Sequence, residues 1–303
     1  MGGPPPTVVE LDSVRKDYGS VAALRGVDLT IHRGEVVAIL GPNGAGKTTA
    51  ISLMLGLRRP TSGEVRLLGL APTDLRARSR CGVMLQESGV PDLLTVRELV
   101  RLFGAYYPRK LPADQVIRQA GLEEKADSRA GELSGGQHQR LYFALAICGD
   151  PEVLFLDEPT VGMDVEGRRA FLASLGEWAS AGRTIVLTTH YLEEADQLAE
   201  RIVVIDRGRI IADAPPAEIK SRVAGKKITV RFRGEVPRGF LEALPVSGLS
   251  VNGDSASMLS AEPVAAVRRI FAESGDEVVD LEVAGADLEE AFVHLTAAEA
   301  VDA

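Results

Sequence analysis

Short, continuous apolar runs recur along the first two thirds of the chain, at residues 36–40, 153–156, 185–187 and 202–205. Buried parallel strands have this pattern, because helices cover both faces of a parallel sheet. Stretches with helical character lie between the runs, at residues 47–57, 165–178 and 192–201. The alternation of strand and helix predicts an α/β fold built around a mostly parallel sheet.

Two parts of this region have a different pattern. The first 30 residues or so alternate apolar and polar positions and contain turn residues, which indicates antiparallel strands along one edge. Residues 88–148 contain no convincing strand and have helical character, which predicts a helical subdomain inserted between the strands.

The last 80 residues or so form a separate pattern. It predicts strands at 227–232, 248–251, 255–259 and 277–283 and helices at 238–244 and 263–274. The order β-α-β-β-α-β matches a ferredoxin-like α+β unit. A proline pair at Pro215 and Pro216 precedes a short helix that leads out of the first part. We therefore expect one domain at 1–221 and a smaller accessory domain at 222–303.

Composition narrows the functional classes. A chain of 303 residues is long for one core and suits two domains. Its net charge of -9 argues against broad binding to nucleic acid or to anionic lipid, because both attract basic surfaces. Acidic residues outnumber basic residues two to one in residues 226–303, so most of this charge belongs to the tail.

Neither a membrane span nor a cysteine framework is expected. No apolar run approaches the length of about 18 residues that a membrane helix needs, and the start of the chain lacks the layout of a signal peptide. A membrane function would therefore depend on another chain for its spans. The two cysteines, Cys81 and Cys148, have no metal-site spacing and favour a reduced, cytosolic protein.

The strongest chemical motif directly follows the first apolar run. It fits GxxxxGK[ST] and consists of Gly41, Pro42, Asn43, Gly44, Ala45, Gly46, Lys47 and Thr48, with Thr49 next. Glycines let successive N–H groups point into one concavity, and the helix that follows adds its positive N-terminus. Lys47 suits the β- and γ-phosphates of a nucleotide, and the hydroxyl of Thr48 suits Mg²⁺. A glycine-rich turn without function is the much weaker alternative.

Two carboxylates follow the second apolar run. Asp157 and Glu158 would stand at the carboxyl edge of a buried strand, where open α/β sheets bind ligands. Asp157 suits Mg²⁺, which prefers oxygen ligands and keeps several waters. Glu158 could orient or deprotonate an attacking water. Acidic residues at a strand end are often only solvated, so the phosphate loop is what favours a catalytic interpretation.

A third motif, Leu133-Ser134-Gly135-Gly136-Gln137, lies between these two and precedes a predicted helix. In this order, the three motifs resemble the nucleotide-binding subunits of ATP-binding cassette (ABC) transporters, whose signature is LSGGQ. The resemblance covers residues from about 7 to 220. It implies a P-loop NTPase cassette that binds ATP and Mg²⁺ and hydrolyses ATP.

The resemblance assigns roles to further residues. Tyr18 matches the aromatic that stacks on adenine, and Gln86 matches the glutamine that touches Mg²⁺ and water. Asp164 matches the aspartate that communicates across the dimer, and His190 matches the histidine that contacts the γ-phosphate. In the family, two cassettes face head to tail, so Ser134, Gly135, Gly136 and Gln137 would complete the site of a second copy.

The tail narrows the resemblance. Residues 288–296 resemble the ending of drug and antibiotic exporter ATPases of the daunorubicin-resistance type, which work with a separate ABC-2 permease. The same residues also have the spacing of an ordinary amphipathic helix. The resemblance implies a cytoplasmic ATPase, held at the inner face of the membrane by its permease, that powers efflux of a hydrophobic drug or antibiotic. An importer ATPase with a regulatory tail and a non-transport ABC ATPase remain as alternatives.

Overall fold

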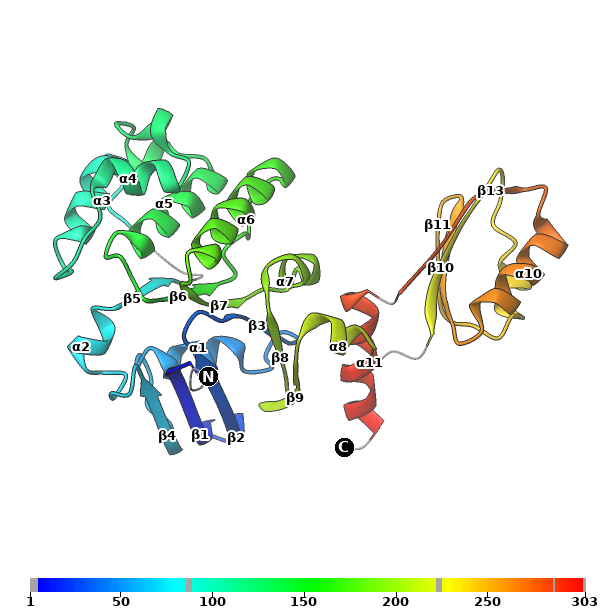
Figure 1. The fold of residues 1–303 in the computed structure, drawn as a ribbon, viewed down its shortest axis with the longest axis horizontal. Coiled ribbons are helices and arrows are strands. Elements are labelled where there is room, and N and C mark those ends of the chain that lie inside the picture. Colours follow the sequence, from blue (N-terminus) through cyan, green and yellow to red (C-terminus); the bar gives the residue numbers. More distant parts are fainter. Residues whose placement is uncertain (1–4, 86–88, 222–224, 286, 302–303) are drawn as a thin grey trace. The chain divides into compact units, whose positions relative to one another are not determined.

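The computed structural model describes residues 5–85, 89–221, 225–285 and 287–301, so the predicted site residue Gln86 lies outside the described residues. The chain divides into two compact units, Met1–Ala214 and Pro215–Ala303, and each is described here by itself (Figure 1). The division precedes the predicted boundary at 221. Helix α8 (Pro216–Ser221) groups with the second unit, where it packs against helix α11 (Leu288–Val301).

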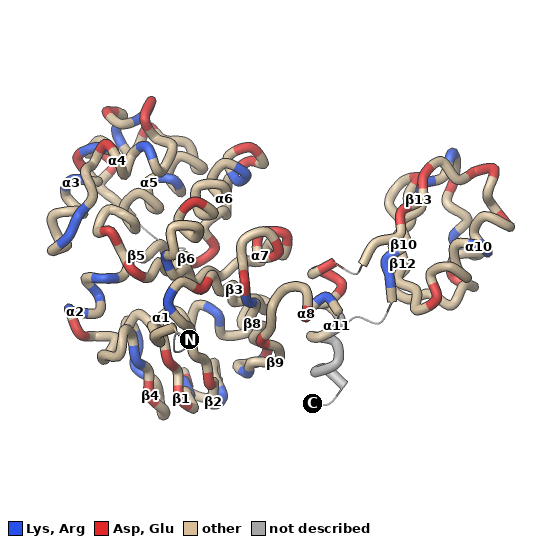
Figure 2. Tube along the Cα trace, in the orientation of Figure 1, with Lys and Arg blue, Asp and Glu red and all other residues tan. Residues whose placement is uncertain are grey.

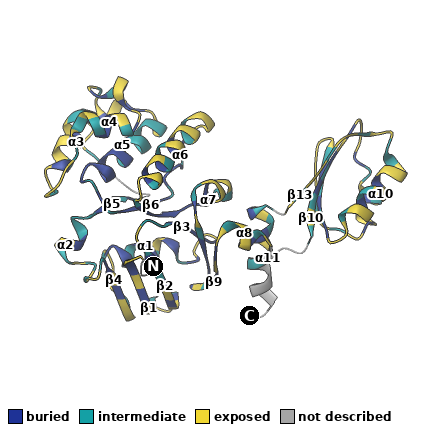
Figure 3. Cartoon of the chain, viewed as in Figure 1, coloured by how far each residue is buried: buried dark blue, intermediate teal, exposed yellow. Residues whose placement is uncertain are grey.

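A six-stranded sheet forms the centre of the first unit. Its strand order is β5-β6-β7-β3-β8-β9, and its strands are β3 (Val36–Leu40), β5 (Cys81–Met84), β6 (Val153–Asp157), β7 (Thr184–Thr188), β8 (Arg201–Asp206) and β9 (Arg209–Ala214). All neighbours are parallel except β8 and β9. Every residue of β3, β6 and β7 is buried (Figure 3). The four apolar runs are thus the central strands that the sequence predicts.

A second sheet lies beside the first. It is antiparallel, in the order β2-β1-β4, and its strands are β1 (Thr7–Tyr18), β2 (Val21–His32) and β4 (Ser62–Leu67). Helix α1 (Lys47–Met54) lies between the two sheets (Figure 1). One hydrophobic core joins them, with Val9 from β1, Ile51 from α1 and Phe155 from β6. The antiparallel strands predicted at the start of the chain are confirmed.

Helices cover the opposite face of the large sheet. The main ones are α5 (Gly135–Ile147), α6 (Val165–Ser180) and α7 (Leu192–Leu198). The ring of Phe143 packs edge-on against Phe171 and Trp178, with centroids 5.1 and 6.4 Å apart. Helices α1 and α7 are shorter than the sequence predicts. Helix α7 ends at Leu198 because Arg201 already begins the next strand.

The inserted region between β5 and β6 is helical, as predicted. Its described residues hold no strand and form, besides α5, the helices α3 (Val96–Gly104) and α4 (Ala113–Gln119) and two short 3-10 turns (Glu123–Lys125 and Ala130–Glu132). A short helix, α2 (Leu75–Arg78), precedes β5. No described helix is long and apolar enough to cross a bilayer.

Both cysteines are buried free thiols in this unit. Cys81 begins β5, and burial raises the pKa of its thiol to about 12. Cys148 follows α5, and burial raises the pKa of its thiol to about 11.

The second unit contains its own four-stranded antiparallel sheet, in the order β11-β12-β10-β13. Its elements are β10 (Lys226–Phe232), α9 (Arg238–Glu242), β11 (Ser247–Asn252), β12 (Ser255–Ser260), α10 (Pro263–Ser274) and β13 (Val278–Gly285), followed by α11. Phe232, Met258 and Ile270 belong to its separate core. Lys227 pairs with Asp287 and Glu290 at 2.8 and 2.5 Å, which ties the start of α11 to β10.

Candidate functional site

The loop of residues 41–48 connects β3 to α1 and requires glycine where the backbone is crowded. Gly46 precedes the helix with a φ of 115°, and a Cβ there would lie 2.6 Å from the carbonyl oxygen of Ala23. A Cβ at Gly41 would collide with the carbonyl oxygen of Ile205. No side chain caps the N-terminus of α1. The first N–H groups of the helix can therefore bind an anion.

Lys47 lies inside this loop with only 6% of its surface exposed. Its Nζ donates hydrogen bonds to the carbonyl oxygens of Gly41 and Pro42, at 2.7 and 3.2 Å. Burial lowers the pKa of Lys47, while the negative charges of Glu158 and Asp157 oppose that shift. The ammonium is thus held in place by two carbonyl oxygens, in the electric field of the two carboxylates.

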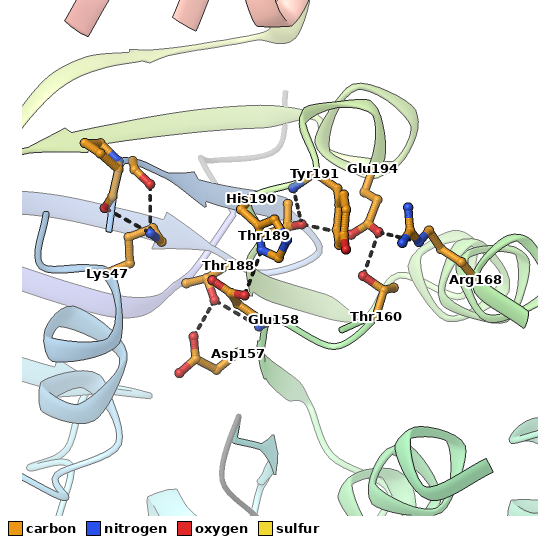
Figure 4. Close-up of polar contacts among 12 residues, drawn as sticks. Lys47, Asp157, Glu158, Thr160, Arg168, Thr188, Thr189, His190, Tyr191 and Glu194 are labelled. Atoms are coloured by element: carbon orange, nitrogen blue, oxygen red, sulfur yellow. Dashed lines mark hydrogen bonds and ion pairs between the residues drawn. The ribbon is translucent and has the colours of Figure 1, made fainter. Parts of the chain in front are cut away.

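One residue of the neighbouring strand, Thr188, bonds the carboxylate of Asp157 and the backbone N–H of Glu158 at the end of β6. Asp157 lies opposite Thr188 in the parallel pairing of β6 with β7, and Thr188 Oγ1 donates to Asp157 Oδ1 at 2.5 Å (Figure 4). The N–H of Glu158 donates to the carbonyl oxygen and to Oγ1 of the same threonine, at 3.0 and 3.1 Å. These bonds hold Glu158 at a φ of 52°, a conformation that costs energy for a residue with a side chain.

The side chain of Glu158 points toward His190. His190 lies two residues after the end of β7 at Thr188, and Glu158 Oε2 and His190 Nδ1 are 2.8 Å apart. These two residues and the phosphate loop surround one open cavity of about 560 Å³. It is lined by Ala23, Asn43, Gly44, Gly46, Lys47, Thr48, Thr49, Glu158 and His190. One cavity therefore brings Glu158 and His190 together with six of the predicted phosphate-binding residues, whereas Gly41, Pro42, Ala45 and Asp157 do not line it.

The LSGGQ segment lies elsewhere in the same unit, at the start of α5. Ser134 caps that helix: its hydroxyl accepts from the N–H of Gln137 at 3.4 Å, and Gln137 Oε1 accepts from the N–H of Ser134 at 3.0 Å. Ser134, Gly136 and Gln137 line a second cavity, of about 720 Å³, together with Asp164. Asp164 caps α6 through a 2.7 Å bond from the N–H of Gly167.

The predicted residues therefore fall into two groups that one chain does not bring together. Tyr18, at the end of β1, belongs to neither cavity lining; it is 43% exposed, and the ammonium of Lys16 lies 5.0 Å from its ring centroid. Sequence reasoning missed Ala23 and Thr188. Thr188 could have been found, because a polar residue ends an apolar run beside the run that ends at Asp157.

Comparisons with known proteins identify the family of this chain. The model of the ABC transporter family matches residues 24–161. The daunorubicin resistance ATP-binding protein DrrA3 of Streptomyces coeruleorubidus is 37% identical over 96% of both chains. A Nod factor export ATP-binding protein I of Cupriavidus pinatubonensis is 35% identical over 97% of this chain and 92% of that protein.

Solved structures match about two thirds of the chain or more. The ATP-binding subunit of an ABC transporter superposes with a TM-score of 0.65 at 28% identity, over 71% of this chain and 93% of that one. A dimeric ATP-binding cassette in a post-hydrolysis state, bound to ADP and Pi, gives a TM-score of 0.62 at 28% identity, over 68% of this chain and 98% of that one. The chain therefore belongs to the ABC transporter family, as an ATP-binding subunit that hydrolyses ATP.

Proposed function

We propose that this chain powers the efflux of a hydrophobic drug or antibiotic through a separate ABC-2 permease. The observation that carries the proposal is the length of the similarity: the relatives named for daunorubicin resistance and for Nod factor export match across the tail as well as the cassette. A cassette alone would not separate exporters from other ABC proteins. The same relatives support a place at the inner face of the membrane, through the permease.

The cavity at the phosphate loop is the proposed ATP site. Lys47 would exchange its two carbonyl partners for the β- and γ-phosphate oxygens, because a charge-assisted bond to phosphate is stronger than a bond to a neutral carbonyl. The N–H groups from Asn43 to Thr49 would bind the same phosphates, except that of Ala45, which donates to the carbonyl oxygen of Pro42 at 3.1 Å. Tyr18 would stack on the adenine.

Within that cavity, Glu158 is the proposed general base. It would take a proton from the attacking water, while His190, already 2.8 Å away, would hold the carboxylate and contact the γ-phosphate. Both groups stand at the carboxyl edge of the parallel sheet. The positions of the two side chains relative to each other are therefore set by β6 and β7.

Mg²⁺ fits the residues at this edge. Thr48 offers a hydroxyl and Asp157 a carboxylate, which are hard ligands of the kind Mg²⁺ prefers. Gln86, the third ligand expected from the family resemblance, lies outside the described residues. The described part of the chain has no group of three or more His, Cys, Asp or Glu residues that could hold a metal. Mg²⁺ needs no such cage, because it binds through few protein groups, substrate phosphates and water. Bound with ATP, it would neutralise charge on the phosphate oxygens.

Thr188→Val should leave strand β7 intact and remove only the hydrogen bonds of the Thr188 hydroxyl. Valine has nearly the same shape and suits a buried strand, but it can neither donate to Asp157 nor accept from the N–H of Glu158. Losing a hydrogen bond to a charged group costs about 1.5 to 3 kcal/mol. We expect a tenfold or larger fall in kcat and a higher Mg²⁺ concentration at half-maximal rate, both measured in steady-state ATPase assays. Thr188→Ser should restore both values, and equal kinetics for all three proteins would contradict this role.

A second copy of the chain is the proposed partner of each site. The signature residues and the phosphate loop line separate cavities, so neither half is complete by itself. The N-terminus of α5, with 13 residues, can donate N–H groups to a γ-phosphate. A head-to-tail dimer would place each signature, with Asp164, against the ATP of the other copy. The dimeric solved relative supports this arrangement.

We propose a ferredoxin-like accessory domain at residues 222–303, within the second unit. Its element order and its antiparallel sheet, in the order β11-β12-β10-β13, support that fold. Figure 2 shows the acidic residues spread over this unit. Such a surface should avoid anionic lipid headgroups, which leaves the permease as the route to the membrane.

Membrane fractionation tests the exporter proposal. The chain should sediment with membranes when an ABC-2 permease is co-expressed and should stay in the supernatant without it. Drug efflux from the cells should require both proteins and an intact Glu158. Membrane binding without the permease, or stimulation of the ATPase only by a substrate-binding protein of an importer, would contradict the proposal.

A further inference from the structure

A buried carboxylate lies behind the pair formed by Glu158 and His190. Glu194 is in α7, only 2% of it is exposed, and it does not line the cavity at the phosphate loop. Nothing in the proposed chemistry uses it. Carboxylates are rarely buried so completely unless they are hydrogen-bonded, so its partners indicate what it does.

Its two oxygens bind two different loops. Thr160 Oγ1 donates to Glu194 Oε1 at 2.6 Å, and Thr189 Oγ1 donates to Glu194 Oε2 at 2.9 Å (Figure 4). Thr160 stands two positions after Glu158, and Thr189 directly precedes His190. Both threonines are 1% exposed. One carboxylate therefore holds the two loops that carry the proposed catalytic pair.

A third element reaches the same carboxylate. Arg168 Nε lies 3.5 Å from Glu194 Oε1, and its guanidinium stacks over the ring of Tyr191 at 3.9 Å. Arg168 belongs to the first turn of α6, where its N–H donates to the carbonyl oxygen of Asp164. The N–H of Tyr191 donates to Thr189 Oγ1 at 2.9 Å. The start of α6 is thus joined to the loop of His190.

Burying the Glu194 carboxylate costs free energy, because the charged group loses its hydration. Burial raises the pKa of Glu194, while the two hydroxyls and Arg168 act in the opposite direction. An apolar side chain could fill the same volume without losing hydration. It could not fix the separation of two loops, because that requires an acceptor for each hydroxyl.

We propose that Glu194 is a positioning residue for ATP hydrolysis. It holds the loop of His190 and the loop of Glu158 at one separation, and through Arg168 it ties both to the start of α6, where Asp164 lies. Nucleotide binding at one cavity and the dimer contact at the other would then be coupled through one carboxylate. This inference rests on the proposed function, since it concerns the same site.

Glu194→Gln tests the inference in the full chain. The amide keeps the shape but loses the charge opposite Arg168 and one of the two acceptors. We expect kcat for ATP to fall about tenfold while KM stays within twofold of the wild type, because Glu194 touches no residue of the phosphate loop. Glu193→Gln is the matched control: it makes the same change at the preceding, exposed position of α7 and should leave both constants unchanged.

Threonine variants test the two arms separately. Thr160→Val and Thr189→Val should each lower kcat, and each should add little to Glu194→Gln, because all three remove the same link. Thr189→Ser, which keeps the hydroxyl, should restore the rate. Wild-type kcat in Glu194→Gln, or fully additive losses, would overturn the inference, even if thermal stability fell. An inactive wild-type chain would instead overturn the proposed function, and this inference with it.

Discussion

Replacing Glu158 by Gln should stop ATP turnover while leaving ATP binding intact. Glutamine has the same size, can keep a hydrogen bond to His190 and leaves the N–H bonds to Thr188 unchanged. It cannot accept the proton of the attacking water. General-base catalysis contributes about 100- to 10,000-fold to a rate, so steady-state hydrolysis should fall by at least about 100-fold.

Two measurements accompany this variant. Phosphate release gives the rate, and gel filtration with ATP and Mg²⁺ should show an ATP-bound dimer that the active protein does not accumulate. Glu177→Gln, on the exposed side of α6, is the control and should behave as the wild type. Normal turnover in the Glu158 variant would refute the assignment of the general base. Loss of ATP binding would also count against it.

Replacing Lys47 by Met should abolish most of the nucleotide affinity. Methionine keeps the length of the buried stem but removes the ammonium, and with it the charged bonds to phosphate. Hydrogen bonds to charged groups contribute about 1.5 to 3 kcal/mol each, so Kd should rise by about one to two orders of magnitude. A fluorescent ATP analogue measures this directly.

The control for Lys47→Met makes the same substitution at a lysine outside the phosphate loop. Lys16→Met removes an ammonium that donates to the carbonyl oxygen of Arg59 and lies near the ring of Tyr18. The Lys16 variant should bind phosphate groups as the wild type does. Inorganic pyrophosphate should therefore compete with the fluorescent analogue at the same concentration in both proteins. A Lys47 variant that folds, by thermal unfolding, and still binds the analogue normally would contradict the phosphate-loop role.

Contiguous motifs made much of the site predictable. The phosphate loop and the pair of carboxylates each lie within a few residues, next to apolar runs whose burial in β3 and β6 the sequence already indicates. The edge strands β4 and β9 were not predicted. Four of the six residues of β4 are exposed and form no apolar run, and β9 has only a short apolar stretch at residues 210–212. The backbone hydrogen bonds of such edge strands require no particular side chains, so the residue types give little indication of them.

The supporting contacts were harder to predict for a different reason. Thr188 and Glu194 act on residues 31 and 34 positions away, through the register of β6 with β7 and the placement of α7. A glutamate in an acidic helix has no local signature, and the position of Thr188 at the end of an apolar run does not show which residues it contacts. Only the pairing of strand ends distinguishes Thr188, and only burial distinguishes Glu194.

The two buried thiols make this chain suitable for site-specific labelling. A maleimide or a disulfide reagent reacts with an accessible thiolate, and burial keeps Cys81 and Cys148 protonated and covered at neutral pH. Because they are the only two cysteines, one introduced at an exposed position would be the sole fast-reacting thiol. Spin labels or fluorophores could then follow the distance between two copies during turnover, with every native residue of the core retained.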